Sequence, residues 1–343
     1  MHTSNLLFWI VENDNPIERN RSADYIMDSA INYYNYDNPH LPYTAGQLFL
    51  DNGAYTAASQ NLNLEVDRIV AVQEAIWPNK TIPLDYPLRP GMGLSAIKKN
   101  WGNTKRNIMY WQENTRLSKR LVAPLHAWDK ESLKRNIGWL QKYADTDLLA
   151  VGSLVNYNEF GGYFGDRQPR RETIDLLTLA VQTINKESDF KVHLMGFGAS
   201  PLTLHLAYYM GAYSTDSSGY RRKAAYGKIV LPGSGERYAG NSSATFGLTM
   251  YTHRDLDLLS ECRCQICRAN PDVLWSSWRA RAAHNEFVMK LEAARADALL
   301  AQGRDAYALY LEDVFSRSSL RYLWKHTKER VRYHRISEYL VGR

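Results

Sequence analysis

Short apolar runs alternate with helical stretches along most of the chain, and this alternation limits the fold more than any other feature. The runs lie at residues 6–11, 47–53, 81–87, 120–127, 148–155 and 191–198. They are rich in Leu, Val and Phe, and most end at Gly, Asp or Pro, so each predicts a buried strand. Residues 129–144 and 171–188 carry apolar side chains at helical spacing. This pattern is typical of an α/β protein with a parallel sheet, and its length suits a (β/α)8 TIM barrel, which we predict over residues 1–255.

Polar residues stand where such a barrel keeps its chemistry. Asp51, Asp85, His126 and the pair Gly152-Ser153 each lie at the C-terminal end of a predicted strand. That end of the strands carries the active site of barrel enzymes. Any one of these residues taken alone is more typical of a turn or a helix cap. Together they predict an active site.

All three cysteines lie within six positions, as Cys262, Cys264 and Cys267. An odd number excludes a closed disulfide framework, so the cluster predicts a shared metal rather than three thiols packed by accident. Zinc takes four ligands in structural sites, and His284, 17 residues after Cys267, is the expected fourth, with His253 as the rival. Long helical stretches follow the cysteines. We therefore predict a helical zinc-binding subdomain over residues 256–343, with a structural Zn²⁺.

Composition limits the compartment and the partners. No run of about 18 apolar residues is present, and the apolar run near the N-terminus is too short for a signal peptide. Thiols fit a reducing compartment, so we expect a cytoplasmic protein, in the host cytoplasm if a virus encodes it. The net charge of +6 permits a polyanionic partner without requiring one. Residues 324–335, which alternate basic and aromatic side chains, are either a solvated helix face or a phosphate-contacting surface.

Several motifs, taken in order, resemble those of the tRNA-guanine transglycosylase superfamily, and most closely its DNA-modifying branch, the DpdA-type DNA-guanine transglycosylases. The stretches that carry the resemblance are "FLDNGAY" (49–55), "VAVQEAIWPNKTIPLDYP" (70–87), "VGSLV" (151–155), "HLMGFG" (193–198), "GAYSTDSSGYRRKAAYGKIVLP" (211–232), and "CRCQIC" (262–267) followed by "AAHNEFV" (282–288). Each is weak alone, but their number, order and spacing make the set specific.

The resemblance implies a (β/α)8 barrel with a zinc subdomain, and an exchange of guanine in a polynucleotide for a 7-deazaguanine base through a covalent sugar–enzyme intermediate. Asp216 matches the family's nucleophile and Asp51 its general acid/base. The residues that match the family's base-binding set are Tyr55, Asp85, His126, Gly152, Ser153, Leu154 and Met195. Since the target base must leave its stack, a single-stranded or opened substrate is expected.

Departures from the family pattern bear on the substrate. Asn52-Gly53-Ala54 stands where the family has Ser-Gly-Gly, Ser153 replaces a glycine, and His126 replaces a glutamine. These changes leave open which 7-deazaguanine enters, 7-cyano-7-deazaguanine being one example. The divergent pocket, the short interval from Cys267 to His284 and the basic, aromatic C-terminal segment favour DNA over tRNA. The alternatives are a tRNA enzyme, a glycosylase that releases guanine without replacing it, and a non-catalytic nucleic-acid-binding subunit. The last is disfavoured because both Asp51 and Asp216 are present. A homodimer and helper proteins are further candidate partners.

Overall fold

The computed structural model describes residues 6–12, 20–89, 91–154, 171–239 and 253–341. Its strands are β1 (Leu7–Val11), β2 (Asn20–Ser29), β3 (Thr44–Asp51), β4 (Lys80–Thr81), β5 (Ala123–Ala127), β6 (Leu148–Leu154), β7 (Lys191–Leu194) and β8 (Ser214–Ser217). They form one eight-stranded sheet in the order β4-β3-β2-β1-β8-β7-β6-β5. The pairs β1–β8, β2–β3, β3–β4, β5–β6 and β6–β7 are parallel. The predicted α/β class with a parallel sheet is therefore confirmed.

One predicted strand is wrong in extent, and two strands carried no apolar signal. The run at residues 81–87 contributes only Thr81 to β4, because Pro83 and Pro87 have no N–H to donate to a sheet. The strand β2 reads "NRSADYIMDS", which is too polar for the apolar pattern. The strand β8 reads "STDS", and all four of its residues are buried despite their polarity.

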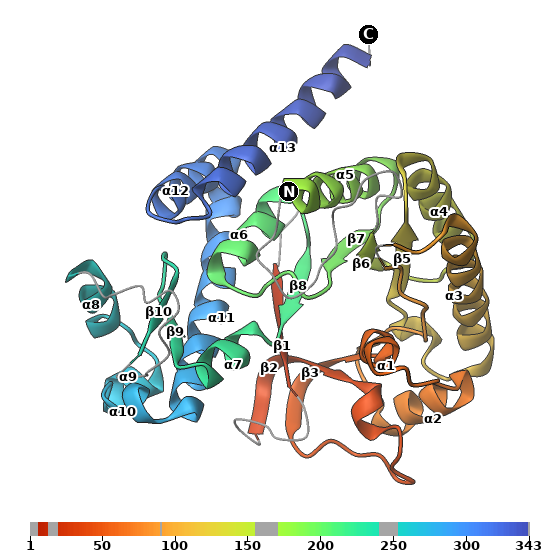
Figure 1. The fold of residues 1–343 in the computed structure, drawn as a ribbon, viewed down its shortest axis with the longest axis horizontal. Coiled ribbons are helices and arrows are strands. Elements are labelled where there is room, and N and C mark those ends of the chain that lie inside the picture. Colours follow the sequence, from red (N-terminus) through yellow and green to blue (C-terminus); the bar gives the residue numbers. More distant parts are fainter. Residues whose placement is uncertain (1–5, 13–19, 90, 155–170, 240–252, 342–343) are drawn as a thin grey trace. The chain divides into compact units, whose positions relative to one another are not determined.

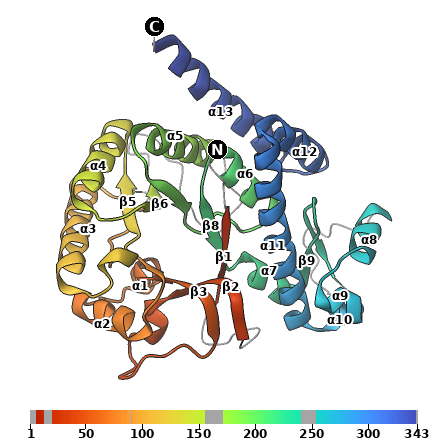
Figure 2. The ribbon, with the colours of Figure 1, turned by 180° about the vertical axis from the view of Figure 1, so that it is seen from behind.

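Helices follow most of the strands. They are α1 (Ala54–Gln60), α2 (Val66–Ile76), α3 (Leu94–Asn114), α4 (Lys130–Tyr143), α5 (Arg171–Glu187), α6 (Pro201–Met210) and α7 (Gly219–Ala225), with 3-10 turns η1 (Ala30–Tyr33) and η2 (Ser118–Arg120). The helix predicted at 129–144 is α4, which begins with a capping box between Asp129 and Ser132. Such a cap contributes about 1 kcal/mol. Figures 1 and 2 both show α3 and α4 side by side along β5.

Further elements follow the sheet in the sequence. They are the antiparallel pair β9 (Lys228–Val230) and β10 (Glu236–Tyr238), and the helices α8 (His253–Ser260), α9 (Gln265–Ala269), α10 (Val273–Ser276), α11 (Trp278–Gln302), α12 (Arg304–Ser316) and α13 (Arg321–Val341). The predicted helical character of this part of the chain is confirmed. None of the helices in the described ranges is long and apolar enough to cross a membrane.

The chain forms two compact units. Unit 1 comprises Met1–Ile10, Gly196–Tyr209 and Tyr213–Lys325, and unit 2 comprises Val11–Met195, Met210–Ala212 and His326–Arg343. In unit 1, a core of Ile229, Leu231, Leu259, Leu274 and their neighbours lies between β9, α8, α10 and α11. In unit 2, Leu50 of β3 packs with Ile69, Val72 and Leu84. Burial of each such side chain stabilises the fold by about 1.5–3 kcal/mol, which fixes the elements that carry the sites described below.

Candidate metal centre and candidate active site

The predicted metal ligands come together in unit 1. Cys262 follows α8, Cys264 is the N-cap of α9, Cys267 lies within α9, and His284 lies near the start of α11. The Nδ1 atom of His284 is 3.7, 3.5 and 3.3 Å from the sulfur atoms of Cys262, Cys264 and Cys267. The four ligand atoms all lie within 4.8 Å of one another, so this group could hold a metal ion.

The geometry fits a tetrahedral cation such as zinc. Zn–S bonds of about 2.3 Å and Zn–N bonds of about 2.1 Å at tetrahedral angles place sulfur and nitrogen about 3.6 Å apart, which agrees with the three S···N distances. The Nε2 atom of His284 is 2.9 Å from the carbonyl oxygen of Val230 in β9. If Nε2–H donates to this carbonyl, Nδ1 turns its lone pair toward the sulfur atoms, as in metal-ligating histidines.

The pKa values of His284 and Cys264 are shifted by the close contact of the ligand groups. Burial lowers the pKa of His284, but hydrogen bonds to Cys262 and Cys264 and the charges on these residues outweigh burial and raise the pKa to about 9. Hydrogen bonds from Cys262 and Cys267 lower the pKa of Cys264. Metal binding displaces protons from cysteine and histidine ligands, so a divalent cation bound by this cluster would take the place of their protons.

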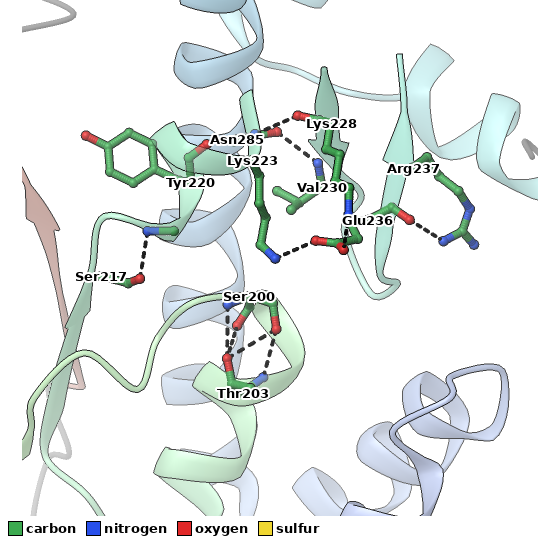
Figure 3. Close-up of polar contacts among 11 residues, drawn as sticks. Ser200, Thr203, Ser217, Tyr220, Lys223, Lys228, Val230, Glu236, Arg237 and Asn285 are labelled. Carbon is green, nitrogen blue, oxygen red and sulfur yellow. Dashed lines mark hydrogen bonds and ion pairs between the residues drawn. The ribbon is translucent and has the colours of Figure 1, made fainter. Parts of the chain in front are cut away.

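A second layer of contacts holds the elements of the cluster together. Asn285, next to His284 on α11, donates to the carbonyl oxygens of Tyr220 and Lys228 and accepts from the N–H of Val230 (Figure 3). Lys223 of α7 and Lys228 of β9 both pair with the carboxylate of Glu236 in β10. These contacts are not predictable from the sequence, because Asn285 and the backbone carbonyl of Val230 carry no ligand signal of their own.

The rival ligand His253 and the more distant His326 differ in what the structure describes of them. His326 in α13 lies 2.8 Å from Asp175 in α5, and both belong to unit 2. His253 is the first residue of α8, but its side chain lies outside the described residues. His284 is thus the histidine found at the cysteine cluster among the described side chains.

Asp216, also in unit 1, lies in a buried and closely packed strand end. Its Oδ1 atom accepts a hydrogen bond of 2.7 Å from the N–H of Gly196, and its carbonyl accepts one from Gly198. A Cβ at Gly198 would lie 2.6 Å from the ring of Phe8 and 3.2 Å from the Asp216 carbonyl, so only glycine lets this loop approach the strand. The side chain of Asp216 is therefore held by the backbone of a neighbouring loop.

Asp51 in unit 2 is the last residue of β3. Its Oδ2 atom accepts from the N–H of Gly53 at 3.0 Å and lies 3.4 Å from the hydroxyl oxygen of Ser29. Gly53 has φ +83°, and a Cβ there would lie 2.5 Å from the Cβ of Ile31. This turn orients the carboxylate of Asp51, and α1 begins directly after it.

Asp85 and His126 lie together in unit 2, as their shared assignment to a base pocket requires. The Nδ2 atom of Asn52 donates to Oδ1 of Asp85 at 3.0 Å, and Nε2 of His126 is 3.0 Å from Oδ2. In the described residues, neither ring nitrogen of His126 has a hydrogen bond of good geometry, although His126 is only 1% exposed. The contact between Nε2 of His126 and Oδ2 of Asp85 is thus close enough for an ion pair but is not aligned as a hydrogen bond. A buried polar group without an aligned partner costs about 1–3 kcal/mol, so the imidazole is suited to a ligand.

The other predicted base-binding residues are placed unevenly. Gly152 and Met195 adjoin, since a Cβ on Gly152 would lie 2.9 Å from the Cβ of Met195. Ser153 is half-buried in β6 opposite His126, and Leu154 pairs with Ala127, although its side chain is outside the described residues. Tyr55 in α1 is 48% exposed. Asp51, Asp85, His126, Gly152 and Met195 thus share unit 2, whereas Asp216 belongs to unit 1.

Two buried polar residues of unit 2 lie next to these sites in the chain and were not predicted from the sequence. Asn52 is buried beside Asp85, and its side-chain Oδ1 atom accepts a hydrogen bond from the N–H of Ala54. Asp28 is buried with hydrogen bonds from Tyr33 and Tyr43, and burial raises its pKa. In the sequence they are marked only by their positions. Asp28 directly precedes Ser29 and Asn52 directly follows Asp51, and Ser29 and Asp51 are in contact.

No protein-family model matches the chain, and no curated protein matches it. The family resemblance therefore stays an expectation based on the motifs, and the functional argument rests on the sites themselves.

Proposed function

We propose that the protein is a DNA-guanine transglycosylase, which exchanges guanine in DNA for a 7-deazaguanine base such as 7-cyano-7-deazaguanine. The observation that carries the proposal is the carboxylate of Asp216, buried at a strand end and oriented by the N–H of Gly196. A buried, oriented carboxylate is what a displacement at a sugar carbon requires, because it can stabilise and then capture positive charge at C1′.

The chemistry needs two carboxyl groups with different tasks. In the first step, Asp216 forms a bond to C1′ of the deoxyribose while the bond from C1′ to N9 of guanine breaks. The leaving base takes a proton from Asp51. In the second step, N9 of the incoming base bonds to C1′, Asp216 leaves as a carboxylate, and Asp51 takes the N9 proton. Protons and charge balance over the two steps, and neither step needs a metal or redox cofactor.

Base recognition is assigned to Asp85 and His126. An ionised carboxylate offers about four acceptor positions, so contacts to Asn52 and His126 leave positions for the N1–H and amino donors of a guanine-type edge. His126 has ring nitrogens without well-aligned partners in the described part of the chain, and these would contact a further polar atom of the base. Met195, adjoining Gly152, would pack on one face of the base.

The finer fold assignments belong to the same proposal. A closed (β/α)8 barrel is supported by a parallel bridge from Thr81 in β4 to Leu121, just before β5. The N–H of Val122 also donates to the carbonyl of Thr81 at 2.8 Å. These contacts join the two ends of the strand order. We assign Zn²⁺ in a structural role to the cysteine cluster, because four protein ligands leave no position for water.

The experiment is a base-exchange assay with labelled 7-cyano-7-deazaguanine, in which single-stranded DNA, duplex DNA and bulk tRNA are offered separately. Label in DNA that is absent with Asp216→Ala supports the proposal. A protein–DNA adduct that survives denaturation and is lost in the same variant would identify the covalent intermediate. Label in tRNA alone would make the protein a tRNA enzyme. Guanine release without incorporation, or no label in any substrate, contradicts the proposal.

A further inference from the structure

A buried carboxyl group that has no part in the chemistry described above lies one residue before the contact between Ser29 and Asp51. Asp28 is the next-to-last residue of β2 and is 1% exposed. A polar group buried to this degree costs stability unless hydrogen bonds satisfy it. The partners of Asp28 therefore show which part of the chain it holds.

Four donors surround Asp28, and three of them belong to the turn that follows it. Its Oδ1 atom accepts from the N–H of Ser29 at 2.7 Å and from Nδ2 of Asn32 at 2.8 Å. Its Oδ2 atom accepts from the hydroxyl groups of Tyr33 and Tyr43, both at 2.7 Å. These four donors match the four acceptor positions of a carboxylate. The 3-10 turn η1 is thus tied at both ends to one side chain.

The same turn contacts the loop that orients Asp51. The hydroxyl oxygen of Ser29 lies 3.4 Å from Oδ2 of Asp51, and the N–H of Gly53 donates to this Oδ2 atom at 3.0 Å. Gly53 lies directly against the turn, since a Cβ there would be 2.5 Å from the Cβ of Ile31 and 3.0 Å from the hydroxyl oxygen of Ser29. The positions of both donors therefore depend on the turn that Asp28 holds.

Apolar packing fixes where the turn lies. Ala30 and Tyr33 of η1 belong to the same core cluster as Leu50 of β3 and Ala54 of α1. Leu50 directly precedes Asp51, so the core holds the backbone of the turn against the strand end. The core cannot align polar groups, because apolar contacts have no direction. The alignment of the N–H and hydroxyl groups of the turn is left to Asp28.

We infer that Asp28 is a positioning residue for Asp51: it fixes the turn, and the turn orients the carboxylate through Ser29 and Ile31. The inference rests on the proposed function only for the proton that Asp51 transfers. The hydroxyl group of Ser29 and the N–H of Gly53 stabilise the ionised form of Asp51. A turn that loosens loses these contacts, so Asp51 should then take up its proton at a higher pH.

A charge on Asp28 would act in the opposite direction. A negative charge near Asp51 favours the protonated carboxyl group, so its loss alone would make Asp51 titrate at a lower pH. Asp28→Ala and Asp28→Asn both exclude such a charge, but only the asparagine keeps an oxygen that can accept from Ser29 and Asn32. The buried acidic residue Glu12, whose charge also acts on this network, is the same in both variants. The two variants therefore differ in their support of the turn and not in charge.

The experiment observes Asp51 directly and needs no substrate. Metal-loaded protein with ¹³C-labelled aspartate carboxyl groups is titrated with acid, and the Asp51 signal is assigned by its absence in Asp51→Asn. We expect Asp51 to titrate about half a unit higher in Asp28→Ala than in Asp28→Asn, which is the effect of one weak hydrogen bond to a carboxylate. Adding Ser29→Ala to both variants should shrink this difference, because the hydroxyl group that transmits the effect is then absent.

Asn32→Ala replaces Asp28→Ala in this test if the latter does not fold, because Asn32 is exposed. It removes one donor from Asp28 within the turn. The matched control is Tyr43→Phe, which removes one donor from Asp28 outside the turn. We expect Asn32→Ala to raise the pH at which Asp51 titrates and Tyr43→Phe to leave it unchanged. Tyr43 is buried, so the control should lose the more stability, and a merely structural role of Asp28 would give the opposite order.

The outcomes separate this inference from the proposed function. Equal titration of Asp51 in Asp28→Ala and Asp28→Asn overturns the inference, and if Asp28→Ala does not fold, equal titration in Asn32→Ala and wild type does so. The expected shift in a protein that exchanges no base supports the positioning of Asp51 and contradicts the transglycosylase proposal. Base exchange with no shift in any variant does the reverse. Where both hold, the alkaline limb of the pH profile for base exchange should move with Asp51, because the first step uses its proton.

Discussion

The cysteine cluster of unit 1 and the Asp85 group of unit 2 are both buried sets of polar side chains, but their donors are directed differently. In the cluster, Nδ1 of His284 faces three sulfur atoms and Nε2 meets the carbonyl of Val230. Beside Asp85, His126 is buried with no well-aligned hydrogen bond within the described residues. The ligand atoms of the first set converge and could hold one small ion. The second set leaves the ring nitrogens of His126 without aligned partners among the described residues, as a site for a larger polar ligand would.

This difference separates a structural role from a binding role. A site whose ligand atoms converge on one point stabilises the fold when the ion binds, because the unfolded chain cannot assemble it. A site that keeps poorly satisfied polar groups costs stability and is retained for what it binds. The comparison therefore predicts that substitutions in the cluster act on stability, whereas those beside Asp85 act on ligand affinity.

The largest effect is expected from His284→Ala. Loss of one ligand opens the site and leaves three thiols without their cation, so we expect zinc content to fall from about one per chain to near zero. The free energy of unfolding should fall by about 4 kcal/mol or more, as for other losses of a structural metal. Metal analysis and denaturant unfolding measure the two quantities. His326→Ala, which removes a histidine bound to Asp175, should retain the zinc. Equal zinc in both variants would exclude His284 as a ligand.

A smaller effect, on binding alone, is expected from Asp85→Asn. Hydrogen bonds to a charged group contribute about 1.5–3 kcal/mol, so the affinity for 7-cyano-7-deazaguanine should fall about 10- to 150-fold. Calorimetric titration with the base measures this change, while the melting temperature should change little. The control is Asp147→Asn, whose carboxylate pairs with Lys80 and Lys191 at the surface. A melting temperature that falls sharply with base affinity unchanged would reverse the roles of the two sites.

Gly152→Ala should moderately lower both the free energy of unfolding and the affinity for the base. The added methyl group would lie 2.9 Å from the Cβ of Met195, so β6 or the chain after β7 must shift. Overpacking of this kind costs about 1–3 kcal/mol, and the displacement of Met195 should also weaken base binding. Gly138→Ala in α4 meets no atom within 4 Å and should stabilise the protein by up to about 1 kcal/mol. Chemical denaturation compares the two. If Gly152→Ala is as stable as Gly138→Ala, the close contact is not a constraint.

The sequence predicts the metal ligands better than it predicts their support, for a physical reason. Cysteines and histidine are ligand types with few other uses in such spacing, so Cys262, Cys264, Cys267 and His284 were recognisable from their spacing. The carbonyl of Val230, which orients the imidazole, belongs to a backbone that every residue has. It became assignable only with the fold.

The strands follow the same rule. Apolar runs predicted β5 and β6 closely, because the buried residues of these strands are mostly Leu, Val and Ala. The strand β8 is equally buried, but it is made of Ser, Thr and Asp, whose burial depends on hydrogen bonds from distant loops. Residues 324–335 give a further example, since His326 and Arg330 both contact Asp175, a partner that their charge pattern does not specify. Contacts between residues that are distant in the sequence cannot be predicted from local sequence patterns.

The smallest effect is expected from Glu236→Gln, which tests the support of the cluster. Burial raises the pKa of Glu236, but Lys223 and Lys228 outweigh it and hold the pKa below the ordinary value of 4.5. A lowered pKa in the folded state stabilises the protein above pH 4.5, and this contribution is lost as the pH falls through the folded pKa. We expect Glu236→Gln to cost up to about 1 kcal/mol at pH 7, since the pair is partly exposed.

The pH profile decides whether the ion pairs are the cause. The difference in unfolding free energy between wild type and Glu236→Gln should shrink as the pH falls from 4.5 through the lowered folded pKa of Glu236, because the wild-type carboxylate then becomes protonated as well. Asp145→Asn, which removes an exposed partner of Lys119, is the control and should change stability less. Because Glu236 lies opposite Val230 in the β9–β10 pair, zinc affinity at pH 7 should fall with stability, by less than in His284→Ala. If the difference in unfolding free energy stays constant across the pH range, packing of the Glu236 side chain and not its charge causes the effect. The cysteine cluster would then depend on the β9–β10 hairpin but not on the ion pairs of Glu236.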